Sequence, residues 1–356
     1  MAGSALMSIG LRAMQAQYAA LQTTGHNISN ANTVGYSRQQ VEFATSGGQY
    51  TGAGFFGKGV DVAAVTRTHN AFLTREMVAT GSMAAADGAR SSQLAMLERV
   101  FGLGEAGIGY AASQFFNAFA DVAARPSDLP SRQVAIARAE QLAARLRDAA
   151  GQVDTLQTGV TTEIRAHVAK ANELGKQIAR LNDLIAKTNG SGQTPNDLLD
   201  QRDAAVAELG RIVPITTVAA DDGTLSVFIG GGQRFVLGAD AARLEAMADP
   251  FDPSRLGIGI ALGTASAVAL PDSMFAGGGA IGGLLRVQND DLVAARNLLG
   301  QMAAAIAGAV NAQQALGIDL TGNAGAALFG AVSPLVMPSS NNSGSAPVGV
   351  VIADPP

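Results

Sequence analysis

Residues 142–185 read LAARLRDAAGQVDTLQTGVTTEIRAHVAKANELGKQIARLNDLI, and this stretch decides the fold. Mostly apolar residues recur in it at alternating steps of three and four, which is a seam of period 3.5. Roughly six heptads of this pattern predict one long helix that starts after Pro130, packs on other helices and ends near Asn189. The seam consists of Leu142, Leu146, Ala149, Val153, Leu156, Val160, Ile164, His167, Ala171, Leu174, Ile178, Leu181 and Ile185.

Helical and strand-like patterns extend from this helix in both directions. Helical periodicity runs from about residue 70 to Gly210, with a break at the prolines of 126–130, and returns over 281–316. Period-2 alternation at 38–44 and 59–65 flanks a Gly-rich segment and predicts a long hairpin with a flexible tip. Beyond residue 211, further strands are expected at 215–218, 225–229, 235–237, 256–262 and 266–270.

These patterns predict an α+β fold that is mainly α: an elongated antiparallel helical bundle with an N-terminal heptad helix and an inserted β-rich domain. The expected parts are an N-terminal axial helix with its turn (1–36), a β-hairpin extension (37–69), a long-helix bundle (70–210 with 280–316), an inserted β domain (211–279) and the start of a second β region or a flexible tail (317–356).

The composition excludes several classes of chemistry. The 356 residues include no Cys, which excludes disulfides, thiolate nucleophiles and Cys-bound metals. The net charge of −5, without a basic cluster, gives no electrostatic footprint for nucleic acid. No run approaches about 18 apolar residues, so we expect no membrane span. The N-terminus lacks the basic start of a conventional secretion signal.

Residues 194–203 allow two interpretations. Thr194 is expected to cap a helix whose first turn contains Pro195, with Asp197 completing a capping-box-like pair. Asp197, Asp200 and Asp203 then lie on one side of that helix, which would suit a divalent metal only if oxygens from other elements converged there. We therefore favour a capped, solvated helix face and expect no metal site.

Other catalytic patterns are weak. The segments 102–107 and 277–282 match G-x-G-x-x-G, but neither follows a strand as a dinucleotide site requires. The three histidines, His26, His69 and His167, are too isolated to form a catalytic group. A hydrolase site on 211–279 is the alternative from the enzyme class, and that region contains no His. We expect no enzyme activity and no cofactor.

The first helix, over about 4–28, has its own seam and no neighbour in sequence to cover it. An isolated helix of this kind is marginal in water, so we expect a partner from another molecule or from the other end of the chain. Its seam consists of Met7, Leu11, Met14, Tyr18, Leu21, Gly25 and Ile28.

This helix closes on HNISNANTVGYSRQ (26–39), which resembles the signature of bacterial flagellar axial proteins of the rod, hook and junction. The continuation at 37–39, the segment NDLLDQRD (196–203), GGLL (282–285) and DLTGNAGAALF (319–329) are similar to the hook-associated protein 1 family. Val34 stands where the signature often has Pro. The signature turn contains Asn27, Asn30, Asn32, Gly35, Tyr36 and Arg38.

The resemblance implies a non-enzymatic structural protein of the extracellular flagellum, secreted through the flagellar type III export apparatus. Such a protein would join hook to filament by assembling into a ring through axial helices and lateral bundle contacts. Its implied partners are other copies of itself, the flagellar hook protein and a second junction protein on the filament side. The alternative is another flagellar axial component, a hook or rod protein. The expected assembly interface is Leu11, Met14, Tyr18, Leu21 and Ile28.

One departure concerns the other end of the chain. The family folds its C-terminus back as a second heptad helix that pairs with the first. The present sequence ends at residue 356 without such a helix, and we expect a truncation. The resemblance would place filament insertion and export-chaperone binding on that missing helix, which leaves both functions in doubt for this chain.

Overall fold

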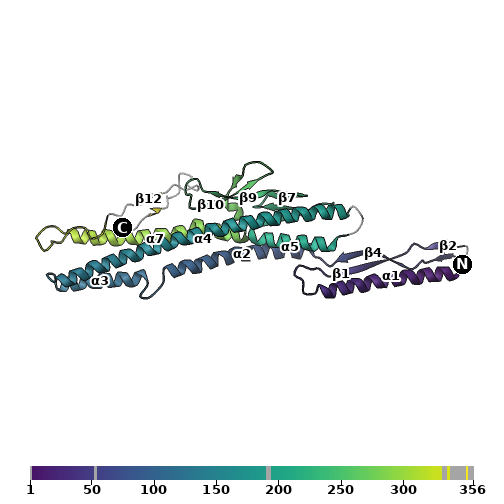
Figure 1. The fold of residues 1–356 in the computed structure, drawn as a ribbon, viewed down its shortest axis with the longest axis horizontal. Helices are drawn as coiled ribbons and strands as arrows, with labels where there is room; N and C mark the ends of the chain where they lie inside the picture. Colours follow the sequence, from purple (N-terminus) through teal and green to yellow (C-terminus); the bar gives the residue numbers. More distant parts are fainter. Residues whose placement is uncertain (1, 52–53, 190–193, 331–334, 337–349, 352–356) are drawn as a thin grey trace. The chain divides into compact units, whose positions relative to one another are not determined.

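The protein is mainly α-helical with small antiparallel sheets, which confirms the predicted fold class (Figure 1). The computed structural model describes residues 2–51, 54–189, 194–330, 335–336 and 350–351. Its longest element is α4 (Leu129–Asn189), the helix predicted from the heptad seam. Every residue of that seam is buried except Leu156 and His167, which are half-buried. The period-3.5 pattern therefore identified the core face of α4 correctly.

The chain forms two compact units, each made from separate stretches of sequence. The first consists of Met1–Ala84, Lys170–Arg243 and Ala261–Ser266, and the second of Ala85–Ala169, Leu244–Ile260 and Ala267–Pro356. The region 211–279, expected as one inserted β domain, folds as two sheets, one lying mainly in each unit. The domain boundaries given above stay a prediction.

In the first unit, an N-terminal helix lies along a two-stranded ribbon. The helix is α1 (Ala2–Ser29), and the ribbon pairs β1 (Gln39–Thr45) with β4 (Val60–Arg67) in antiparallel register (Figure 1). The ribbon tip, where a flexible loop was expected, instead holds a second antiparallel pair, β2 (Gln49–Thr51) with β3 (Gly54–Phe56). The rings of Tyr50 and Phe55 contact each other across this pair with centroids 5.5 Å apart, which stabilises it.

The first unit also contains α5 (Asn196–Ile212) and an antiparallel sheet in the order β5-β6-β7-β8. The capping prediction for α5 is wrong, because its N-cap residue is Pro195 and no side chain caps it. Asn182 of α4 is fully buried and bonds the backbone of Leu225 and Gly238, which fixes the sheet on the helix. The strands are β5 (Ile215–Ala219), β6 (Leu225–Ile229), β7 (Gln233–Leu237) and β8 (Asp240–Ala241).

In the second unit, helices pack on α4 and carry a three-stranded sheet in the order β11-β10-β9. Helix α2 (Ala71–Val100) runs through both units, and α3 (Ile108–Ala124) follows it. The sequence did not predict β9, whose residues lack clear alternation. The sheet strands are β9 (Arg243–Ala248), β10 (Leu256–Ala261) and β11 (Val268–Leu270).

The helix predicted over 281–316 is interrupted by a π-helical turn. It consists of α6 (Gly279–Arg286), the π turn η2 (Val287–Asp291) and α7 (Leu292–Ala315), preceded by the 3-10 turn η1 (Asp272–Phe275). π-helical turns are rare, and they occur mostly as single turns within α-helices, frequently at functional sites. Two short strands, β12 (Leu335–Val336) and β13 (Val350–Val351), complete the described chain.

Candidate functional site

The apolar seam of α1 faces solvent. Leu11, Met14, Tyr18, Leu21 and Ile28, the residues of the expected assembly interface, are between 56% and 71% exposed. They form one stripe along the helix, here called the α1 stripe, together with Met7, which is 80% exposed. A shallow, mainly apolar groove of about 420 Å³ is centred on its middle part. Contiguous exposed apolar surface of this kind marks an interaction site.

The opposite face of α1 packs on the ribbon. Ala16 is buried there with 1% exposure. Arg12 forms an ion pair of 3.2 Å with Asp61 of β4 and a hydrogen bond with Ser46. A Cβ atom at Gly59 would lie 3.4 Å from the Ile9 side chain, so the chain there comes close to the helix. The helix is therefore anchored on one side only, and the α1 stripe is left uncovered.

The signature turn is organised by Asn27, the last residue but two of α1. Its side-chain amide pairs with the backbone of Gln39 at both ends, donating to the carbonyl at 2.9 Å and accepting from the N–H at 2.9 Å. The same oxygen of Asn27 accepts a bond of 2.7 Å from the Tyr36 hydroxyl. His26 also contacts Tyr36, at 3.1 Å. Asn27 thus ties the end of the helix to the first residue of β1.

The first two helical turns of α5 hold the signature turn and the root of the ribbon, which is the end where Gln39 pairs with Arg67. Asp200 accepts a hydrogen bond of 2.7 Å from the backbone N–H of Ser37 and forms an ion pair of 2.8 Å with Arg67. Arg67 forms a second ion pair, of 2.7 Å, with Asp203. The side chains of Arg67 and Asp200 are only 11% and 8% exposed. Hydrogen bonds between charged groups in such a buried setting are strong.

Two more residues of α5 complete the contact, which we call the α5 clasp. Asn196 donates a bond of 2.7 Å to the carbonyl of Val65, and Asp197 accepts one of 2.8 Å from the Gln39 side chain. The predicted solvated face is therefore wrong for Asp200, which is buried because its partners come from distant segments of the chain. The segments 26–39 and 196–203, which carried the resemblance, are in direct contact.

Burial and nearby charges alter two ionisable groups around the clasp. Desolvation, followed by the carboxylates of Asp197 and Asp200, raises the pKa of the Tyr36 hydroxyl. Burial lowers the pKa of Arg202, against the opposing effect of Asp203. Arg202 donates a bond of 2.7 Å to the carbonyl of Gly223, so it joins α5 to the turn between β5 and β6.

The other residues of the signature turn have smaller roles. Asn30 donates to the carbonyl of His26 at 3.1 Å, which closes the last turn of α1. Gly35 has a φ of 83°, a conformation that favours glycine, and a Cβ there would lie 3.2 Å from Ala204 of α5. Asn32 and Arg38 are exposed. The proposed roles of these residues and of the α1 stripe stay predictions.

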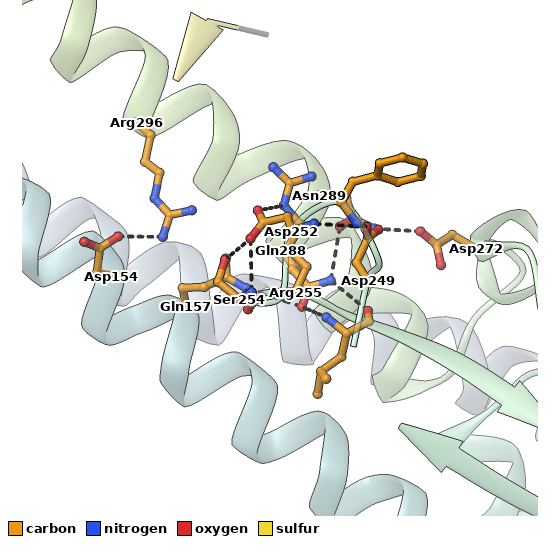
Figure 2. Close-up of polar contacts among 12 residues, drawn as sticks. Asp154, Gln157, Asp249, Asp252, Ser254, Arg255, Asp272, Gln288, Asn289 and Arg296 are labelled. Atoms are coloured by element: carbon orange, nitrogen blue, oxygen red, sulfur yellow. Dashed lines mark hydrogen bonds and ion pairs between the residues drawn. The ribbon is translucent and has the colours of Figure 1, made fainter. Parts of the chain in front are cut away.

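A second polar cluster, in the second unit, fixes the three-stranded sheet on the helices (Figure 2). Gln288 of η2 is 1% exposed and pairs with the backbone of Leu256 through two hydrogen bonds of 2.9 Å. Gln157 of α4 donates to the carbonyl of Ser254 at 3.1 Å. The paired residue Gln288 lies within the π turn. Within the described part of the chain, no group of three or more His, Cys, Asp or Glu residues could hold a metal ion.

One helical segment bears on the expected absence of a membrane span. By length and composition, Gly279–Ala315 is long and apolar enough to cross a membrane. In its most apolar 18-residue stretch, 28% is buried inside the protein. Length and composition do not identify a membrane span, because a core helix meets the same criteria. Leu284, Leu292 and Leu299 of this segment are buried in the second unit.

Comparisons with known proteins match nearly the whole chain. A family model described as the helical domain of flagellar hook-associated protein FlgK matches residues 94–329, and one described as flagella basal body rod protein matches 7–36. Flagellar hook-associated protein 1 of Escherichia coli is 32% identical over 353 residues, or 99% of this chain. That of Salmonella typhimurium is 32% identical over 342 residues, or 96% of the chain.

A solved structure is also similar. The flagellar hook junction protein FlgK from Burkholderia pseudomallei matches with a TM-score of 0.69 and 35% identity, over 76% of this chain and 49% of that one. The present chain spans 64% of the length of the Escherichia coli relative and 62% of the Salmonella typhimurium relative.

Proposed function

The chain belongs to the family of the flagellar hook-associated protein FlgK, and we propose that it joins hook to filament as a structural component of the bacterial flagellum. The family is one of structural flagellar proteins, and we propose no catalytic role. The observation that carries the proposal is the α1 stripe, an exposed apolar face on a helix whose opposite face is held by the ribbon.

In this proposal, copies of the chain assemble into a ring through α1 and through lateral contacts of the helical bundle. Burying a side chain that is already partly covered contributes about 1–2 kcal/mol, so the five residues of the expected interface together contribute roughly 5–10 kcal/mol. Association itself costs an estimated 4–15 kcal/mol. A single α1 contact is therefore weak, and stable assembly needs several neighbours at once.

Assembly also requires a fixed orientation of α1, and the α5 clasp supplies it. Without it, the segment between α1 and β1 would be a turn of Asn, Thr and Gly residues with free dihedral angles. When Asn27 and Asp200 make their hydrogen bonds, α1 is held in one orientation relative to α5. Assembly then does not have to order the turn, which lowers its entropic cost.

The proposed partners follow from the family. They are other copies of the chain, the hook protein on one side and a second junction protein on the other. We place the protein in the extracellular flagellum, after secretion by the flagellar export apparatus. A hook or rod component remains the alternative. The match of the FlgK helical domain over 94–329, far beyond the shared N-terminal segment, supports the junction role instead.

The test is complementation of a strain that lacks the gene. Leu21→Glu places a charge in the α1 stripe, and Gln15→Glu places the same charge at an exposed polar position of α1. We expect Gln15→Glu to restore filaments and Leu21→Glu to leave hooks bare in electron micrographs, with both proteins secreted. Normal filaments with Leu21→Glu would contradict the assembly role of the stripe. Absence of hooks in the deletion strain would favour the alternative.

A further inference from the structure

Two methionines occupy the N-terminal half of the α1 stripe. Met7 and Met14 are seven residues apart, two helical turns, so their side chains lie on the same face. Met7 is 80% exposed and Met14 is 68% exposed, next to Leu11 and Tyr18. Their thioethers are thus accessible to a dissolved oxidant while the stripe is uncovered.

The composition of the chain makes exposed methionines its main targets for oxidation at sulfur. There is no Cys among the 356 residues, so no thiol competes for an oxidant, and thioethers are the oxidisable sulfur groups. Hydrogen peroxide transfers one oxygen atom to the sulfur as its O–O bond breaks, and the other oxygen leaves as water. The sulfur loses two electrons, and an apolar side chain becomes a polar sulfoxide.

We infer that Met7 and Met14 form an oxidation-sensitive site on the α1 stripe, at which peroxide blocks assembly by converting the thioethers to sulfoxides. The inference rests on the proposed function, in which the stripe is buried against neighbouring subunits. A sulfoxide oxygen buried without a hydrogen-bond donor loses its hydration. Leu11, which lies between the two thioethers, offers no donor, and among the stripe residues only the Tyr18 hydroxyl, one turn beyond Met14, could donate. Sulfoxide reduction would restore the surface, so the block is reversible.

The same reasoning gives a magnitude. We expect oxidation of the pair to weaken the binding of α1 by at least about tenfold, equal to about 1.4 kcal/mol. Oxidation of a subunit already assembled is slow in this scheme, because the thioethers are then covered. The sensitivity therefore belongs to the free subunit.

The experiment measures binding of the full chain to isolated hooks from a strain that lacks it, before and after treatment with hydrogen peroxide. Mass spectrometry of peptides identifies the sulfoxides, and circular dichroism verifies that the helices persist. The protected variant is Met7→Leu with Met14→Leu, which keeps the stripe apolar. The matched control is Met77→Leu with Met83→Leu, because these residues of α2 are 60% and 52% exposed but lie outside the stripe.

We expect peroxide to reduce binding of the wild type and of the α2 control at least tenfold, and to leave the α1 double variant binding as before. Equal binding of oxidised and untreated wild type would overturn the inference while leaving the proposed function intact. So would a loss of binding by the oxidised α1 double variant as large as that of the wild type. If untreated wild type fails to bind hooks, the proposed function fails and the inference with it.

Discussion

Replacing Asp200 with Asn tests whether the α5 clasp holds the signature turn. The substitution keeps the shape of the side chain and an oxygen for the Ser37 N–H, but it removes the charge that pairs with Arg67 at 2.8 Å. Breaking one partner of a buried ion pair costs about 3–5 kcal/mol. Arg67 keeps its second ion pair with Asp203, at 2.7 Å, so we expect a loss nearer about 2–3 kcal/mol.

The loss is expected to be local. Asp200 contacts the turn and the ribbon root, so the opening that it resists exposes the amide of Ser37 rather than the core of α4. A change of about 2–3 kcal/mol corresponds to roughly 30- to 150-fold faster hydrogen exchange at that amide. Exchange along 30–40 is the assay, measured by mass spectrometry with residue-resolving fragmentation.

Asp183→Asn is the matched control. Asp183 pairs with Lys187 at 2.6 Å one turn along α4, but these side chains are 43% and 70% exposed. Exposed pairs of this spacing contribute about 0.3–0.5 kcal/mol, so the control should change exchange about twofold or less. An unchanged Ser37 amide in Asp200→Asn, or an equal effect of the two variants, would refute the clasp as described.

Two further predictions concern packing and ionisation. Gly283→Ala should lower the free energy of unfolding by about 3 kcal/mol, because its Cβ would clash with the backbone oxygen of Ala86, whereas Gly308→Ala has open space and should raise it by about 1 kcal/mol in the same urea titration. Similar effects of the two substitutions would contradict the close approach of α2 and α6. Desolvation and the nearby carboxylates raise the pKa of Tyr36 above 10.0, so its contribution is present below that pH and is lost as pH rises through the folded-state value; the stability difference between wild type and Tyr36→Phe should therefore shrink as pH rises above 10.0. A difference that stays constant over that range would count against this environment for Tyr36.

Much of the fold could be predicted because its signal is local. The α4 seam repeats through many heptads, and burial follows the repeat nearly residue by residue. The α1 stripe shows the same period, and its exposure is consistent with an unpartnered helix. The interruption at η2 was not predictable in this way. Gln288 of this turn pairs with Leu256, 32 positions earlier in the chain, and helical periodicity contains no signal for such a contact.

The candidate site was harder to predict from the sequence, because its contacts join residues that are far apart in the chain. The bond between Ser37 and Asp200 spans 163 positions, and that between Arg67 and Asp200 spans 133. An acidic residue every third position on a helix looks like a solvated face until those partners are known. The one available signal was that Asp200 lies in a segment that carried the family resemblance, which suggests constraint without giving its cause.

The site divides two tasks between two kinds of interaction. Polar contacts of Asn27, Asp200 and Arg67 give α1 a direction but no energy of association, because they are complete within one chain. The apolar α1 stripe gives energy of association but no direction, because burial is not directional. The two kinds of variant should therefore differ. Leu21→Glu should abolish hook binding with an unchanged Ser37 amide, and Asp200→Asn should weaken binding only through the entropy of reordering the turn. If Asp200→Asn abolished binding as completely as Leu21→Glu, the clasp would have to contact the partner directly, and this division of roles would be wrong.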